Sequence, residues 1–377
     1  MQKLFLKNLK KYDCSLITAI CVCVIFGTFM VFSSSTVMAD IRWSSPYKFF
    51  IKQILWVTLG FAVMSITAFL IDYKFYQKYA KLIYFISLLL VVMVLFVGSS
   101  HLGAKRWLKI YFFTIQPSEL VKFSMIIFVS DFISRKKNIL HQLKGLIWVI
   151  LALLSIILPI ALEPDLGAPI LIIWVCFSMM FCAGIKMRTV FMCVMIVFFL
   201  GIVEVVRKPY RFIRFKDYFA SFSNIEASSY QVKQSLNALG SGGFLGKGLG
   251  KSEMKLMYLP EAHTDFIFPI IGEELGFLGT SMVVFFFVYL FFKGIKMSKY
   301  MPDIFSYYLC LGITFSIVFE SIINLSVTTG LLPAKGLPLP FISFGGTSLI
   351  STMAAAGVLI NLSQYVKKNQ YNKKYKK

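Results

Sequence analysis

The sequence predicts an all-α integral membrane protein with ten transmembrane helices and one long extracytoplasmic loop. Its 377 residues are 58% hydrophobic and 16% aromatic, which is more apolar surface than a soluble chain of this size needs to bury. The apolar residues gather into runs of about 17–25, the length that crosses a bilayer as a helix. Because lipid offers the backbone no hydrogen-bond partners, such runs predict helices, here in one domain.

Ten runs are long enough to span, and the first, from Ser15, lacks a small-residue cleavage site and is expected to be a retained helix. In chain order, the expected spans are 15–34, 52–71, 82–98, 118–134, 145–162, 167–184, 189–205, 265–292, 304–327 and 341–362. The membrane domain therefore covers 15–363. It lies between a short N-terminal segment, 1–14, and a basic tail, 364–377, whose lysine-rich part from Lys367 is expected to be solvated and loosely ordered.

The basic residues predict an orientation. The formal net charge is +22, and Lys and Arg lie mainly between the apolar runs. This pattern favours membrane orientation and anionic lipid, rather than nucleic acid, as the reason for the charge. With both termini cytoplasmic, 22 of the 39 Lys and Arg residues fall in cytoplasmic segments and 7 in the short outer segments. We therefore expect cytoplasmic termini and a long outer loop at about 206–264, a length typical of functional loops.

Cysteine and histidine predict no metal cage. Six of the seven cysteines fall within apolar runs and no CxxC pair exists, so neither a disulfide framework nor a zinc site is expected. The three histidines, His101, His141 and His263, share no metal-ligand spacing. No Ser-His-Asp or Cys-His grouping indicates a covalent nucleophile.

Asp265 opens the eighth span at its outer end, within YLPEAHTDFIFPIIGEELG at 258–276. A helix N-terminus favours an ionised carboxylate, so Asp265 could simply cap this helix. The alternative is a reaction at the outer surface in which the carboxylate takes a proton. The sequence leaves both interpretations open.

Glu273 and Glu274 follow Asp265 in the same run, about 12–14 Å deeper along a continuous helix. Acids at such depth should face the bundle and be paired. Gly272 and Gly276 flank them with the G-x-x-x-G spacing that permits close helix contact. We expect these two acids to be structural polar groups.

Charged and polar residues also occur in two other spans. Glu119 and Lys122 are three apart on the fourth span, hence neighbours on one helix face, with Ser118 as a possible helix cap. They predict either a self-contained ion pair or the charged floor of a polar cavity. Glu320 and Asn324, four apart in the ninth span, predict another interhelical polar contact.

The glycine-rich stretch GSGGFLGKGLG at 240–250 resembles a phosphate-binding loop, but it lacks the Gly-Lys-Ser/Thr ending and follows no expected strand. We interpret it as a flexible or closely packed loop near the membrane. The basic outer loop around it would suit an anionic ligand, such as a lipid pyrophosphate, or anionic head groups.

Six motifs occur in a characteristic order: GAKRW, QPSELVK, EPDLG, YQVKQSLNALGSGG, YLPEAHTDFIFPIIGEELG and GLLPAKGLPLPFISFGGTS. From about residue 15 to 363 the chain resembles the SEDS family of shape, elongation, division and sporulation proteins (FtsW, RodA and SpoVE). The last two motifs look more like the division member FtsW than the elongation member RodA. Departures are small: SFGGTS replaces the commoner SYGGSS, and the segment between Pro209 and Tyr230 is leaner.

The resemblance implies a ten-span glycosyltransferase of the bacterial cytoplasmic membrane that polymerises lipid II, an undecaprenyl-pyrophosphate-linked disaccharide-peptide, into peptidoglycan strands, here for septal synthesis in cell division. The implied partners are a class B penicillin-binding protein, other divisome or elongasome membrane proteins and membrane lipids, without nucleic acid. A divalent cation, Mg²⁺ or Mn²⁺, is a further possibility. The alternatives are a lipid II flippase and a non-catalytic scaffold that activates a penicillin-binding protein.

The resemblance also implies roles for residues. Asp265 matches the family's catalytic aspartate, and Glu119 and Lys122 match its intramembrane pair. Glu273, Glu274 and Glu320 are expected to be structural. The candidates for substrate binding are Lys105, Arg106, Gln231, Gln234, Ser241, His263, Thr264, Lys335, Ser343 and Thr347.

Overall fold

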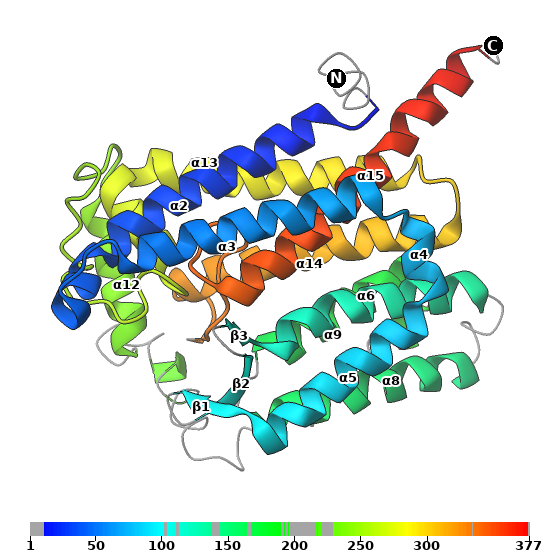
Figure 1. Ribbon diagram of the computed structural model, residues 1–377, viewed down its shortest axis with the longest axis horizontal. Coiled ribbons are helices and arrows are strands. Elements are labelled where there is room, and N and C mark those ends of the chain that lie inside the picture. Colours follow the sequence, from blue (N-terminus) through cyan, green and yellow to red (C-terminus); the bar gives the residue numbers. More distant parts are fainter. Residues whose placement is uncertain are drawn as a thin grey trace.

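The computed structural model is a bundle of long helices running roughly side by side (Figure 1). It describes residues 11–101, 104–110, 113–136, 143–163, 167–189, 218–220, 229–333 and 335–375, together with the isolated residues 192, 195 and 216. The expected seventh span, 189–205, lies almost entirely outside these residues, so the count of ten spans stays a prediction.

Each of the other nine expected spans corresponds to a helix that begins within five residues of the expected start. They are α2 (Cys14–Trp43), α3 (Lys48–Ser65) continued by the π-helical turn η1 (Ile66–Leu70), α5 (Ala80–Val97), α6 (Pro117–Arg135), α8 (Leu143–Leu162), α9 (Gly167–Cys182), α13 (Ile267–Ser298), α14 (Ile304–Thr328) and α15 (Gly346–Tyr375). Six of the helices in the described residues are long and apolar enough to cross a membrane by length and composition. The short helix α4 (Tyr73–Lys78) connects η1 to α5.

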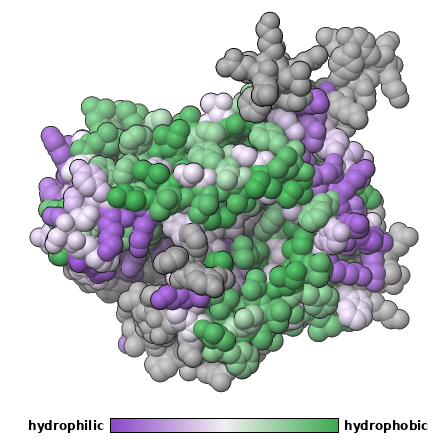
Figure 2. All heavy atoms as spheres, in the orientation of Figure 1, coloured by the Kyte–Doolittle hydropathy of each residue, from purple (hydrophilic) through white to green (hydrophobic). Residues whose placement is uncertain are grey.

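The surface of the bundle has the distribution that a bilayer requires. In Figure 2 the hydrophobic residues cover the middle of the molecule, and the hydrophilic ones gather towards its two ends. Large apolar side chains such as Phe29, Phe85 and Phe285 are more than half exposed. Because water would penalise so much contiguous apolar surface, the chain is a multi-pass membrane protein.

The beginning of α2 and the last part of α15 meet at one end of the bundle (Figure 1). The Asp13 backbone N–H donates to Ser363 Oγ at 2.9 Å, and Lys367 Nζ donates to the Tyr12 carbonyl at 2.6 Å. The Asp13 side chain also caps α2 by accepting from the backbone N–H of Ser15. This bond satisfies one of the N–H groups that have no partner within the first turn of the helix. Both ends of the described chain therefore lie on the same side. Helix α15 continues to Tyr375, so the lysine-rich segment that begins at Lys367 is helical up to that residue.

The opposite end carries a small sheet and a short helix that the sequence interpretation missed. Strands β1 (Ser99–His101), β2 (Ala104–Ile110) and β3 (Phe113–Ile115) form an antiparallel sheet in the order β1-β2-β3. Helix α12 (Tyr230–Ser241) lies at the same end (Figure 1). Asp265 lies in the segment 242–266, which follows α12 and leads into α13.

Three local expectations were wrong. Helix α13 is not continuous, because Gly276 has non-helical angles (φ 66°, ψ −159°) that break it nine residues after its start. Asp265 does not cap α13, since the N-cap residue is Phe266 and the structure records no side-chain capping bond there among the residues it describes. Ser118 does not cap α6, because that helix begins at Pro117 with Gln116 as its N-cap.

Candidate active site

Asp265 is half-buried at the end of the long loop between α12 and α13, two residues before α13. Its carboxylate lies against the backbone of Gly336, in the segment between α14 and α15. A Cβ built on Gly336 would be only 2.7 Å from Asp265 Oδ2. Glycine at 336 is therefore what allows the carboxylate to occupy this position, at an exposed point of the segment.

Three consecutive carbonyl groups fix the backbone that carries this carboxylate. The His263 carbonyl accepts from the Phe344 backbone N–H at 2.9 Å. The Thr264 carbonyl accepts from the Ser343 hydroxyl at 2.5 Å. The Asp265 carbonyl accepts from Asn324 Nδ2 at 2.8 Å. With every one of these carbonyls engaged, residues 263–265 are held to α14 and to the segment before α15.

His263 packs as a buried aromatic group beside the candidate catalytic residue. It is 5% exposed, and its ring centroid lies 4.4 Å from that of Phe49 and 5.6 Å from that of Phe344. Burial lowers the pKa of His263 below its ordinary value, against an opposing effect of Glu261. A neutral imidazole is thus favoured, with a packing role. Its neighbour Thr264 donates its hydroxyl to Glu261 Oε2 at 2.9 Å.

A buried charge triad lies in the bundle. Lys122 Nζ is 2.7 Å from Glu119 Oε2, as the spacing predicted, and also 2.7 Å from Glu320 Oε1 on α14. All three side chains are at most 6% exposed. The pair on α6 is therefore not self-contained, since its ammonium group also holds α14, and Glu320 contacts this lysine rather than an uncharged partner. Two acids around one lysine make the lysine the member whose loss costs most.

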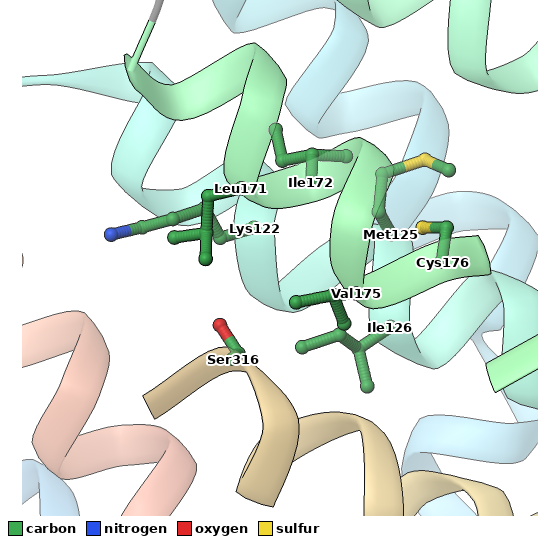
Figure 3. Close-up of a pocket in the computed structure, with 8 residues that line it drawn as sticks. All are labelled: Lys122, Met125, Ile126, Leu171, Ile172, Val175, Cys176 and Ser316. Carbon is green, nitrogen blue, oxygen red and sulfur yellow. The ribbon is translucent and has the colours of Figure 1, made fainter. Parts of the chain in front are cut away.

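A narrow fissure lined mostly by apolar side chains runs beside the triad, between α6, α9 and α14. The lining residues are Lys122, Met125, Ile126, Leu171, Ile172, Val175, Cys176 and Ser316. In Figure 3 the Lys122 amine lies at the opposite end of this fissure from Met125 and Cys176. The fissure is apolar apart from the Lys122 amine and Ser316, so it does not present the polar groups that a sugar would need.

Glu273 and Glu274 have basic partners from the outer loop. Glu273 accepts from Lys247 Nζ at 2.9 Å and from the Ser252 hydroxyl. Glu274 accepts from Lys255 Nζ at 2.9 Å, and Ser33 on α2 donates to it at 2.7 Å. Both carboxylates are completely buried. They tie the loop to the first segment of α13, which is a structural role.

The glycine-rich loop packs closely on the break in α13. A Cβ on Gly242 would lie 1.9 Å from the Gly272 carbonyl oxygen, and one on Gly246 would lie 2.2 Å from the Glu274 carbonyl oxygen. The Lys247 and Gly248 backbone N–H groups donate to the carbonyls of Glu273 and Glu274. The loop glycines thus allow backbone-to-backbone contact within the protein, and these N–H groups are not presented to a phosphate.

The remaining substrate-binding candidates lie on several separate elements. Ser343 and Thr347 connect backbone segments, since Thr347 Oγ1 accepts from the Gln116 N–H and donates to the Thr114 carbonyl. Arg106 is half-buried on β2, where its Nε donates to the Glu163 carbonyl at 3.1 Å. Lys335 is half-buried and adjoins Gly336.

The last candidates lie on α12 and on β2. Gln231 and Gln234 are half-buried on α12, and Ser241 is exposed at its end, where its hydroxyl donates to the Ala238 carbonyl. Lys105 lies on β2, and its side chain is outside the described residues. Among the residues that the structure describes, no three His, Cys, Asp or Glu side chains converge on a possible metal position.

The sequence interpretation missed Asn324 and Gly336 as neighbours of Asp265, and Lys247 and Lys255 as partners of the two acids. The four-residue spacing of Glu320 and Asn324 was the available signal, because it places both on one face of α14. Nothing in the spacing indicated which loop would meet that face.

A family model described as cell cycle protein (FTSW_RODA_SPOVE) matches residues 13–368. Among curated proteins, the chain is 35% identical to the probable peptidoglycan glycosyltransferase FtsW of Trichlorobacter lovleyi, over 96% of this chain and 95% of that protein. It is 37% identical to the stage V sporulation protein E of Bacillus subtilis, over 90% of this chain and 93% of that protein.

Solved structures share the fold at lower identity. One is a chain from a study of the structural coordination of polymerisation and crosslinking by a peptidoglycan synthase complex. It is 22% identical with a TM-score of 0.77, over 93% of this chain and 97% of that chain. Another is the rod shape determining protein RodA of Thermus thermophilus, 23% identical with a TM-score of 0.71, over 96% of this chain and 98% of that chain. The predicted all-α membrane fold is confirmed.

Proposed function

Because the chain belongs to the FtsW/RodA/SpoVE family of cell cycle proteins, we propose that it is a peptidoglycan glycosyltransferase that polymerises lipid II at the outer face of the bacterial cytoplasmic membrane. The observation that carries this proposal is the half-buried Asp265 carboxylate at the end of the bundle opposite the two termini. The backbone that bears it is held by Asn324, which donates to the Asp265 carbonyl, and by Ser343, which donates to the Thr264 carbonyl. The names of the FtsW relatives favour septal synthesis during cell division.

Lipid II suits a site at this boundary because the molecule has a prenyl tail and a large polar head. The tail can stay beside the exposed apolar side chains of the bundle while the sugars reach the outer end. Lys335, next to the Gly336 that borders Asp265, and Arg106 on β2 are our candidates for the pyrophosphate. Lys247 and Lys255 are poorer candidates because they hold Glu273 and Glu274.

The proposed reaction joins the 4-hydroxyl of an acceptor GlcNAc to C1 of a donor MurNAc. Asp265 takes the hydroxyl proton, or accepts its hydrogen bond, as the new C1–O bond forms. The bond from C1 to the pyrophosphate oxygen breaks, and the lipid pyrophosphate leaves with the electron pair. Since pyrophosphate is a good leaving group, one carboxylate suffices, and the paired acids of glycoside hydrolysis are not required.

A divalent cation is compatible with this site if the protein and the substrate hold it together. Mg²⁺ is commonly held by one or two carboxylates together with substrate phosphates, instead of by an all-protein cage. Asp265 with the substrate pyrophosphate would fit that habit. Such an ion would supply charge neutralisation of the leaving group.

The proposed partner is a class B penicillin-binding protein that cross-links the strands. It is supported by the likeness of this fold to a chain of a peptidoglycan synthase complex. We also propose that both termini are cytoplasmic, because 22 of the 39 Lys and Arg residues would then lie in cytoplasmic segments. Other divisome or elongasome membrane proteins remain proposed partners on the family likeness alone.

One observation favours a second candidate function, the transport of lipid II across the membrane. Helix α13 is broken at Gly276, and broken helices are typical of transporters. The break, however, is filled by the glycine-rich loop, which contacts it backbone to backbone. The described loop residues therefore occupy the break, and we favour the transferase.

The test is polymer formation from labelled lipid II by the purified protein together with a class B penicillin-binding protein. Polymer that lysozyme digests would support the transferase. Absence of polymer, with lipid II movement measured in liposomes containing the protein, would support the transporter. Absence of both, with the partner's cross-linking stimulated, would support the scaffold.

A further inference from the structure

Asn324 lies where α14 meets both sides of the candidate active site. Its Nδ2 group donates to the Asp265 carbonyl at 2.8 Å and to the Leu337 carbonyl at 2.7 Å. Leu337 follows Gly336, against which the Asp265 carboxylate lies. One amide nitrogen thus fixes the backbone that carries the carboxylate and the backbone that borders it.

The two bonds use the full donor capacity of this side chain, since an amide NH₂ group has two hydrogens. The side chain is 2% exposed, and its Oδ1 has no hydrogen-bond partner among the described residues. Of the small polar side chains, only an asparagine can donate twice from one atom at this point. An aspartate would donate nothing, and it would bring a second negative charge near Asp265.

Asn324 lies on α14, the helix that a buried ion pair connects to α6. Glu320, one turn earlier on α14, pairs with Lys122 of α6 at 2.7 Å. Residues four apart share a helix face, so the same face of α14 is fixed by the buried charge triad and then holds Asp265. A functional group is positioned best by a rigid element whose own contacts are locked, and α14 meets that condition.

We infer that Asn324 is the positioning residue for Asp265, an inference that rests on the proposed glycosyltransferase function. Asn324 touches no reacting atom. By bonding the Asp265 and Leu337 carbonyls it sets where the carboxylate lies relative to Gly336, so its loss should lower the rate of transfer more than the affinity for lipid II.

The chain offers a matched control in Asn361. This residue is 5% exposed on α15, its Nδ2 donates to the Ala68 carbonyl at 2.8 Å, and its Oδ1 also has no partner among the described residues. Asn324→Ala and Asn361→Ala therefore remove a similarly buried amide that holds a carbonyl of another segment, but only the first borders Asp265.

The experiment compares lipid II polymerisation by wild type, Asn324→Ala and Asn361→Ala, each with a class B penicillin-binding protein, and records kcat, KM and thermal stability. We expect Asn324→Ala to lower kcat by roughly 100-fold, the effect of about 1 Å of misplacement, with KM within about threefold of wild type. We expect Asn361→Ala to lose comparable stability with kcat within about threefold. Asn324→Ser, which keeps one donor, should fall between wild type and Asn324→Ala, and it replaces the alanine variant if that variant does not fold.

Equal kcat values for the Asn324 and Asn361 variants, beside an active wild type, would overturn this inference and leave the proposed function standing. A parallel fall of kcat and stability in both would show a merely structural role and overturn it too. A wild type that makes no polymer with its partner would overturn the proposed function, and this inference with it.

Discussion

The contact between Asp265 and Gly336 predicts that a single added methyl group impairs the reaction without unfolding the protein. In Gly336→Ala the new Cβ would lie 2.7 Å from Asp265 Oδ2, whereas ordinary contacts begin near 3.4 Å, so the carboxylate must move by about 0.7 Å. Because a misplacement of about 1 Å can cost roughly 100-fold in rate, we expect kcat for lipid II polymerisation to fall by about 10- to 100-fold. That fall corresponds to about 1.4–2.7 kcal/mol of activation free energy.

The stability of Gly336→Ala should stay within about 0.5 kcal/mol of wild type, since residue 336 is exposed and the atom that must move is the end of a side chain. Gly345→Ala is the matched control in the same segment. Its added Cβ would meet Ser348 Cβ at 3.5 Å, an ordinary contact, so its rate should equal that of wild type. A wild-type kcat in Gly336→Ala, or an equal loss in both variants, would refute the placement of the carboxylate.

Three further predictions concern the surroundings of the site. Lys122→Met leaves two buried acids uncompensated and should lower the free energy of unfolding in detergent by about 3–5 kcal/mol. Glu320→Gln keeps the Glu119–Lys122 ion pair and should lower the free energy of unfolding far less. Equal losses of stability in the two variants would contradict the triad. Gly246→Ala should destabilise more than Gly250→Ala, because both have φ near 80° but only the first adds a Cβ that collides with backbone, and thermal unfolding of the two variants would test this. Burial lowers the pKa of His263, so the unfolded chain takes up its proton at higher pH, and stability should fall as pH drops below about 6.5; a His263→Gln variant with the same slope of stability against pH would contradict this.

The helices could be predicted because the bilayer imposes a length and a composition on every span. The expected start of the span at 82, for example, differs by two residues from that of α5 at Ala80. The break in α13 could not be predicted in the same way. Gly276 sits in an apolar run that reads as continuous, and its positive φ is stabilised by backbone contacts with Phe244 and Gly246, residues far earlier in the chain.

The candidate site was only half predictable for a related reason. The Glu119–Lys122 contact is local, and three-residue spacing on one helix suffices to predict it. The third member of the triad and the two bonds of Asn324 depend on which helix packs beside which, and no local pattern carries that information. The family motifs indicated Asp265, but its position against Gly336 needed the packed structure.

The central claim is that Asp265 is the carboxylate that accepts the proton of the acceptor hydroxyl. The most direct test is lipid II polymerisation by Asp265→Ala with a class B penicillin-binding protein, after equal partner binding has been verified. The control is Asp40→Ala, which removes an exposed acid near the C-terminal end of α2. We expect polymer from wild type and Asp40→Ala, and a loss of at least about 100-fold in Asp265→Ala. Polymer at the wild-type rate from Asp265→Ala would remove this residue from the chemistry and return attention to Glu119, Glu273 and Glu274.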